Sequence, residues 1–215
     1  MSETSTIQPL PFVRHPHQHR FQAWAPKLSR CIVLTSWPAI QLWAWLEGSP
    51  DIKQYCERPT TAIIDGKDQL VDFWFQQGNE EHWWFIRTND ELPLEQETSG
   101  ILSPPISNDV LEFISADSFA AHAIWIDNWL SILPYLASNA RLVDPALITE
   151  VIVKCKTATT LRTIEQAHVN HDLMLVRTAI FMALHRGNLI GIDLHERRWD
   201  AMSQFIRSNR DHHAT

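Results

Sequence analysis

The sequence has few cysteines and no long apolar run, and each absence excludes a class of protein. Three cysteines occur in 215 residues, Cys31, Cys56 and Cys155, and no two are spaced as CxxC. An odd, scattered set is typical of a reducing compartment rather than of a disulfide framework. No apolar run approaches the ~18 residues that a membrane span needs, and residues 1–10 lack a signal-peptide pattern. We therefore expect a cytoplasmic protein without a membrane partner.

The sequence also lacks the basic surplus that is usual in proteins whose main role is to grip nucleic acid. Its formal net charge is −7. Residues 1–140 contain 8 Lys and Arg against 17 Asp and Glu, whereas residues 141–215 contain 10 against 8. Any contact with nucleic acid is therefore expected to be local or to be assisted by a partner.

Aromatic residues, by contrast, are abundant. The chain contains ten Trp and nine Phe, and 45% of its residues are hydrophobic. Because aromatic side chains bury large areas, this composition excludes disorder over most of the chain. The length suffices for one large core or two small ones.

The patterning of residues 29–138 predicts an α/β domain. We expect a strand at 30–35 and then a buried apolar helix, which Ser36 caps and residues 48–50 end. Three strands in a meander are expected next, and alternation along the middle strand places Leu70, Asp72 and Trp74 on one face. These three strands are expected at 60–64, 69–75 and 82–87, with turns at 65–66 and 77–79 between them. An acidic surface loop at 88–107 and one more strand at 110–114 should follow.

The remaining segments predict a polar N-terminal arm over residues 1–28 and a helical domain over residues 139–210. A helix that Asp117 or Ser118 caps should run to Trp129, and Pro134 should break or kink the chain near residues 132–136. Helices at 145–154, 160–168 and 172–185 should precede a strand at 189–192. Helix, short helix, longer helix and strand is the order found in a winged helix.

Several short motifs occur in the order of a known family pattern. That pattern has a strand, a helix beginning Ser-x-x-Glu and ending Leu-Glu, and a Pro-x-Val-type turn. Gln-Pro or Arg-Pro, then Pro-Asp-Phe, and a strand with Glu-x-Lys or Gln-x-Lys follow. The corresponding residues are Ser36, Leu46-Glu47, Pro50-Asp51-Ile52, Glu57-Arg58-Pro59, Asp72-Phe73, the strand 82–87, Asp127-Asn128-Trp129 and Arg186-Gly187-Asn188-Leu189. Over residues 28–205 the chain resembles the TnsA-like endonuclease subunit of heteromeric transposases. The resemblance implies a restriction-endonuclease-like domain followed by a winged-helix domain.

The resemblance also implies where a catalytic site would lie. Nucleases of this kind hold Mg²⁺ with carboxylate oxygens, and a lysine positions or activates the attacking water. Asp72 matches the metal-binding aspartate. Ala39 occupies the position of the glutamate in Ser-x-x-Glu, Phe85 that of the Glu or Gln in the last strand, and Arg87 that of the lysine. Ala and Phe cannot bind a metal ion, and Arg stays protonated. We therefore expect no metal or cofactor, with Asp72 the only metal-binding position that is kept.

These substitutions predict a catalytically degenerate TnsA-like protein. It would act as a DNA- or protein-binding subunit in transposition or a related mobile-element process, together with transposase and ATPase subunits. Two alternatives stay open. One is an active Mg²⁺-dependent endonuclease that cuts at transposon ends, and the other is a winged-helix DNA-binding regulator unrelated to transposition.

Five arginines are candidates for contact with a DNA backbone if the last domain is a winged helix. They are Arg162, Arg177, Arg186, Arg197 and Arg198. Carboxylates lie among them in the sequence, so a solvated surface of mixed charge is an equally good interpretation.

Two histidine motifs and a tryptophan pair complete the candidates. His15-Pro16-His17-Gln18-His19 is interpreted as part of the polar arm, and His168-x-x-His171 lacks a third zinc ligand at suitable spacing. Trp83 and Trp84 are adjacent in a strand and should point to opposite faces of the sheet, so one of them is expected in an exposed cleft or a protein interface.

Overall fold

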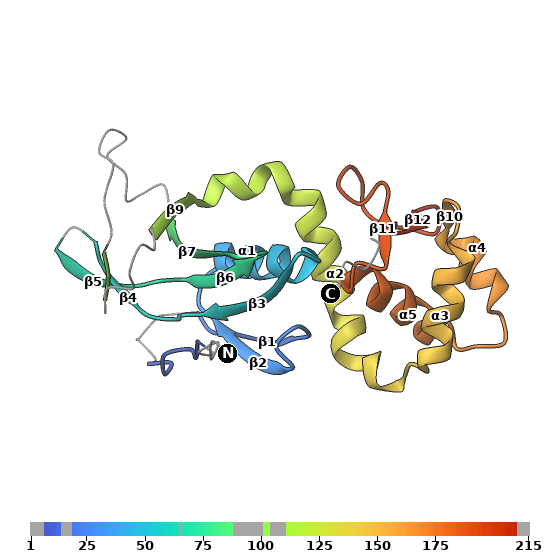
Figure 1. Cartoon of the computed structure of the whole chain (residues 1–215), viewed down its shortest axis with the longest axis horizontal. Helices are drawn as coiled ribbons and strands as arrows, with labels where there is room; N and C mark the ends of the chain where they lie inside the picture. Colours follow the sequence, from blue (N-terminus) through green and yellow to red (C-terminus); the bar gives the residue numbers. More distant parts are fainter. Residues whose placement is uncertain (1–6, 14–18, 65, 88–100, 104–110, 210–215) are drawn as a thin grey trace. The chain divides into compact units, whose positions relative to one another are not determined.

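A computed structural model of the whole chain describes residues 7–13, 19–64, 66–87, 101–103 and 111–209 (Figure 1). The chain forms two compact units, a mixed α/β unit and a mainly helical one. The first unit comprises residues 1–46 and 51–121, and the second comprises residues 47–50 and 122–215. Within the described residues, no helix has both the length and the apolar character needed to cross a membrane.

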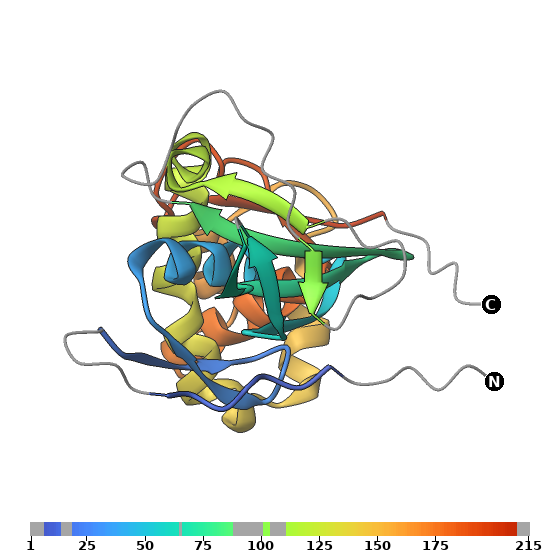
Figure 2. The same ribbon diagram turned by 90° about the vertical axis from the view of Figure 1, so that its left-hand side faces the viewer.

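The described residues of the first unit form three sheets. Its main sheet has the order β3-β6-β7-β9, with β9 parallel to β7 and the other pairs antiparallel. A two-stranded ribbon of β1 and β2 and a sheet of order β5-β4-β8 accompany it (Figure 2). The strands are β1 Phe21–Ala25, β2 Arg30–Leu34, β3 Ile52–Glu57, β4 Thr61–Ile64, β5 Lys67–Leu70, β6 Phe73–Gln77, β7 Glu80–Arg87, β8 Ile101–Ser103 and β9 Leu111–Ser115.

Helix α1, Trp37–Gly48, covers one face of the main sheet. The Ser36 hydroxyl accepts the backbone N–H of Ala39 and so caps the helix, as the sequence predicts. The Trp45 ring stacks on Trp84, and the Trp43 indole donates to the Tyr55 hydroxyl at 3.0 Å. The opposite face carries a second buried cluster, Cys56, Ala62, Ile64, Val71, Trp74, Trp83 and Leu111. Within α1 itself the side chains of Ile40, Leu42, Trp43, Ala44 and Leu46 are all buried, which explains why the helix is apolar on nearly every side.

The expected strand at 69–75 is wrong, because two strands of different sheets occupy this region. Strand β5 pairs with β4, and β6 pairs with β3 and β7. Between them the Val71 N–H donates to Thr60, and the Asp72 N–H donates to Trp84. The alternation of Leu70, Asp72 and Trp74 therefore does not apply. Leu70 is exposed and Trp74 is buried, since the chain changes sheets at residues 71–72.

Part of the expected polar N-terminal arm forms a β-strand. Residues 21–25 form β1, which pairs with β2 along its whole length. Residues 52–57, expected to begin as a turn, form strand β3. The Gln77-Gly78-Asn79 turn joins β6 to β7 as expected, and Gly78 supplies the required positive φ of 62°. Asp65 and most of the acidic segment 88–107 lie outside the described residues.

The second unit consists of helices and one small antiparallel sheet (Figure 1). The Asp144, Thr160 and Asp172 side chains cap α3, α4 and α5 by accepting backbone N–H groups, as is usual for these residue types. The sheet has the order β10-β12-β11. The elements are α2 Ala123–Asn139, α3 Pro145–Lys154, β10 Thr159–Thr160, α4 Leu161–Ala167, α5 Leu173–His185, β11 Leu189–Gly191 and β12 Gln204–Arg207, with 3₁₀ segments Ala116–His122 and Ala140–Leu142.

The bounds expected for the helix after residue 116 are wrong, and the chain does not break at Pro134. The first segment is a 3₁₀ helix, and α2 begins only at Ala123. Helix α2 then continues through Pro134 to Asn139. Its buried side chains, which include Trp129, Ile132 and Leu133, stabilise it by packing, and this outweighs the hydrogen bond that proline removes.

The two units divide earlier than the domain boundary expected after residue 138. The division lies between residues 121 and 122, so α2 belongs to the second unit, as do residues 47–50. A buried ion pair explains the second assignment, because fully buried Glu47 lies 2.7 Å from the His185 ring. Gly48 likewise packs against the ring of Trp129 so closely that a Cβ atom would lie 2.4 Å from it.

Candidate functional site

Asp72 lies in the main-chain connection between β5 and β6 and is half-buried. Its carboxylate accepts the backbone N–H of Ile86 at 2.7 Å, and its own N–H donates to the Trp84 carbonyl at 3.1 Å. Its carbonyl accepts the N–H of Arg58 at 2.9 Å. These contacts join the connection to β7 and to the end of β3, so the carboxylate has a structural role of its own.

Phe85 and Arg87 lie on β7 and share a face with buried Trp83. The Phe85 ring packs edge-on against Phe113 of β9, with 5.9 Å between ring centroids. The Arg87 guanidinium lies 4.0 Å from the centroid of the same Phe113 ring. A cation over an aromatic face is an attractive contact. Both positions are therefore filled by an aromatic cluster, where the family pattern has metal- and water-binding groups.

Ala39 comes from α1, whose Trp45 stacks on Trp84. Because side chains alternate along a strand, Trp84 faces away from Phe85 and Arg87. Helix α1 thus lies on the other face of the sheet from these two residues, so Ala39 is not part of the cluster that Phe85 and Arg87 form on Phe113.

An acidic residue near Asp72 was missed in the sequence, but arginines neutralise it. Glu57 of β3 is only 2% exposed and receives two hydrogen bonds from Arg30, at 2.7 and 2.6 Å. Arg58 lies 3.9 Å away and adopts a positive φ of 48°, which is strained for a residue with a side chain. The hydrogen bond to Glu57 raises the pKa of Arg30, whereas burial lowers the pKa of Arg58.

This arrangement suits an ion-pair network better than a cation site. Both Glu57 oxygens are engaged by Arg30, and one Asp72 oxygen is engaged by the Ile86 N–H. Within the described ranges, no three His, Cys, Asp or Glu side chains are grouped closely enough to hold a metal ion. A magnesium site normally draws on several oxygen ligands.

The five candidate DNA-binding arginines fall into two groups. Arg177 donates to Glu165 at 2.7 Å, Arg197 donates to Asp193 at 2.6 Å, and Arg198 donates to Asp127 at 2.9 Å. Arg162 at the start of α4 and Arg186 after α5 are exposed and form no ion pair with the described residues. The sequence identified all five as cations but could not show that three have carboxylate partners.

Helix α5 offers little that could read DNA. Most of its side chains are buried, and the exposed residues of its first turn are Leu173 and Met174, each 47% exposed. Val169, in the turn before the helix, is 79% exposed. Exposed apolar side chains at this end are more typical of a protein contact than of a phosphate contact.

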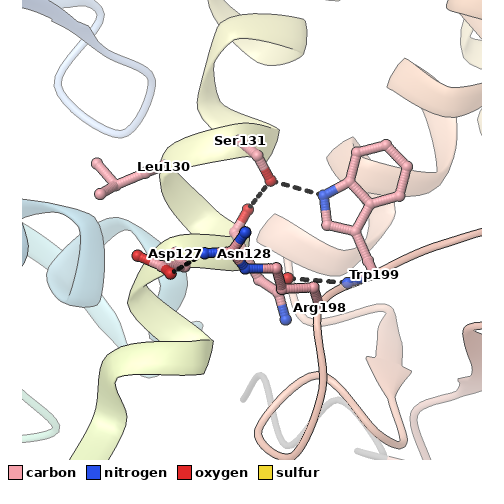
Figure 3. A pocket seen from close by; sticks show the side chains of 6 residues that line it. All are labelled: Asp127, Asn128, Leu130, Ser131, Arg198 and Trp199. Atoms are coloured by element: carbon pink, nitrogen blue, oxygen red, sulfur yellow. Dashed lines mark hydrogen bonds and ion pairs between the residues drawn. The ribbon is translucent and has the colours of Figure 1, made fainter. Parts of the chain in front are cut away.

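A pocket of about 520 Å³ lies between α2 and the loop that joins β11 to β12 (Figure 3). The Asn128 amide donates to the Leu194 and Arg197 carbonyls, and its oxygen accepts the Trp199 N–H. The Trp199 indole donates to the Ser131 hydroxyl, which in turn donates to the Asn128 carbonyl. These bonds hold the loop against α2. The sequence analysis did not identify this role of Asn128, although a polar residue on the buried face of an apolar helix could have indicated it.

The histidine motifs and the tryptophan pair have different surroundings. Of the N-terminal histidine tract, residues 15–18 lie outside the described residues. The His168 and His171 rings lie 6.2 Å apart. Trp83 is 1% exposed, whereas Trp84 is half-buried and donates from its indole to Glu112 at 3.1 Å.

No protein-family model matches the sequence, and no curated protein shows significant similarity to it.

Proposed function

We propose that this chain is a catalytically degenerate TnsA-like protein that acts as a DNA- or protein-binding subunit in transposition or a related mobile-element process. The observation that carries the proposal is the environment of Asp72. Its carboxylate bonds to the Ile86 backbone, while Phe85 and Arg87 pack on Phe113. The nearest buried acid on the adjoining strand, Glu57, is neutralised by Arg30. These contacts stabilise the fold, and the described residues include no carboxylate cluster that could hold a metal ion to activate water.

The order of elements supports the family part of the proposal. The elements of the first unit follow the order of the family pattern, with strand β2, helix α1, the Asp72-Phe73 pair and strand β7 in turn. After α2, the second unit continues in the order α3, β10, α4, α5, β11 and β12, and its three strands form a sheet of order β10-β12-β11. This is consistent with a winged helix, in which the segment between β11 and β12 would be the wing.

Protein binding is the better supported of the two binding roles. Three of the five candidate arginines already have carboxylate partners, and α5 exposes Leu173 and Met174. We propose transposase and ATPase subunits of the same element as the partners, and their genes should neighbour the gene of this chain. A DNA-binding regulator is the second candidate, because Arg162 and Arg186 are exposed and unpaired among the described residues.

A nicking assay tests the catalytic part of the proposal. Supercoiled plasmid is incubated with the full chain or with Asp72→Asn, in millimolar Mg²⁺ or Mn²⁺. We expect no nicking above the background of a buffer control by either protein. Metal-dependent nicking by the wild-type chain that disappears in Asp72→Asn would establish an active endonuclease instead.

Fluorescence anisotropy with duplex DNA separates the two binding roles. If DNA is the ligand, Arg162→Ala/Arg186→Ala should weaken binding more than the matched pair Arg197→Ala/Arg198→Ala, whose side chains already have carboxylate partners. We expect weak affinity that neither pair changes by more than about twofold, which is about 0.4 kcal/mol. Tight binding that is lost only in the first double variant would favour the regulator.

A further inference from the structure

A second hollow in the helical unit is lined by residues that the proposed function does not use. Its volume is about 490 Å³, and it lies between the last turn of α3 and the end of α4. Lining residues are Glu150, Val153, Lys154, Lys156, Ala167 and His168. It shares no lining residue with the pocket of Figure 3.

The first unusual feature of the hollow is a buried imidazole. The His168 side chain is only 8% exposed. Its Nδ1 donates to the Ile164 carbonyl at 2.8 Å, which fixes the orientation of the ring. The other nitrogen, Nε2, lies 3.8 Å from the Glu150 carboxylate, too far for a hydrogen bond. In a neutral ring this Nε2 is therefore a hydrogen-bond acceptor that no donor of the described residues reaches.

The second feature is the combination of charge and apolar surface. Lys154 and Lys156 are exposed, and neither forms an ion pair within the described part of the chain. Val153 is 50% exposed beside them, and Val169, next to His168, is 79% exposed. Glu150 is the only acidic lining residue, so the lining carries an excess of positive charge.

We propose that this hollow docks an acidic, partly apolar segment of a partner protein. Carboxylates of the segment pair with Lys154 and Lys156, an apolar side chain covers Val153 and Ala167, and a backbone N–H donates to Nε2 of His168. Nucleic acid fits less well, because half-exposed Val153 and the more exposed Val169 would face its phosphates. The inference rests on the proposed binding role, since it names the chemistry of the partner.

Selection from a phage-displayed library of random dodecapeptides on the immobilised full chain tests the proposal. We expect enriched peptides to combine Asp or Glu with neighbouring apolar residues. Synthetic copies should bind Lys154→Glu/Lys156→Glu at least tenfold more weakly than the wild-type chain. The control Lys53→Glu/Lys67→Glu makes the same charge change at exposed positions of the other unit and should bind normally. Unfolding curves of both double variants check that each is folded.

Three outcomes would overturn the inference. In the first, no acidic peptides are enriched. In the second, Lys154→Glu/Lys156→Glu binds the peptides as tightly as the wild-type chain. In the third, this double variant loses binding of a DNA duplex but still binds the peptides. None of them bears on the nicking assay, which probes Asp72 in the other unit. Failure of this inference and failure of the proposed function are therefore distinguishable.

Discussion

The carboxylate of Asp72 accepts the N–H of Ile86, and this contact changes the meaning of a familiar sequence motif. In the family pattern that the sequence resembles, the aspartate of this pair is a metal ligand. Here the neighbouring positions pack as an aromatic cluster on Phe113, and the nearby acid Glu57 is paired with Arg30. A residue type thus suggests a chemistry, but its contacts decide whether the chemistry is available.

The three cysteines differ in burial, and this gives a prediction at the residue scale. Burial raises the pKa of Cys56 to about 12 and that of Cys155 to about 11, from an ordinary 9.0. Cys31 is exposed. Since the thiolate is the reactive form, iodoacetamide at pH 8 should label Cys31 and leave the two buried thiols unmodified. Mass spectrometry of tryptic peptides gives the result.

The same raised pKa values imply a loss of stability in base. The unfolded chain releases the Cys56 and Cys155 protons near pH 9, whereas the folded chain keeps them, so the free energy of unfolding should fall as the pH rises above about 9. Cys56→Ala/Cys155→Ala should flatten this slope. Rapid labelling of both buried thiols at pH 8 in the native chain would contradict the assigned burial.

At the scale of elements, α2 and the loop after β11 depend on one side chain. Asn128 is 1% exposed and bonds to three backbone groups of residues 194–199. The Ser131 hydroxyl adds one bond to the Trp199 indole. The loop that would be a wing is therefore fixed to the preceding helix by a buried amide.

Asn128→Ala should lower the free energy of unfolding by about 2–4 kcal/mol, because it leaves buried backbone groups without partners. Amide exchange at Trp199 should accelerate even where the global stability is restored by a stabilising osmolyte. Ser131→Ala is the matched control and should cost only about 1 kcal/mol, since Ser131 is exposed and water can replace both of its bonds, to the Trp199 indole and to the Asn128 carbonyl. Equal costs for the two variants, measured by urea denaturation, would argue against this role of Asn128.

At the scale of the molecule, the position of the boundary decides which fragments can fold. The second unit begins at residue 122 and also includes residues 47–50. Within it, Glu47 pairs with His185, and Gly48 contacts Trp129. The boundary expected from sequence, after residue 138, removes α2 together with Asn128 and fully buried Trp129.

A fragment of residues 122–215 should therefore fold cooperatively but melt at a lower temperature than the same unit in the full chain, because His185 and Trp129 lose partners. A fragment of residues 139–215 should not fold, because it lacks the buried face of α2. Circular dichroism melting and the dispersion of amide proton shifts measure both. A folded 139–215 fragment as stable as 122–215 would restore the boundary expected from sequence.

Local rules control several elements of this chain, and these elements can be predicted from the order of residues. Ser36, Asp144 and Asp172 cap helices where their residue type favours capping, and Gly78 provides the positive φ of a hairpin. These outcomes depend on neighbours within a few residues, so the order of residues is enough to predict them.

Other features depend on contacts between residues far apart in the chain, and the folded structure specifies them. It split the run at 69–75 between two sheets, because β4 competes with the main sheet for pairing. It carried α2 through Pro134, since burial outweighs one lost hydrogen bond. It also paired Glu57 with Arg30 and placed His168 beside Lys154 and Lys156. Burial and partners over such separations are properties of the folded chain, so no local pattern specifies them.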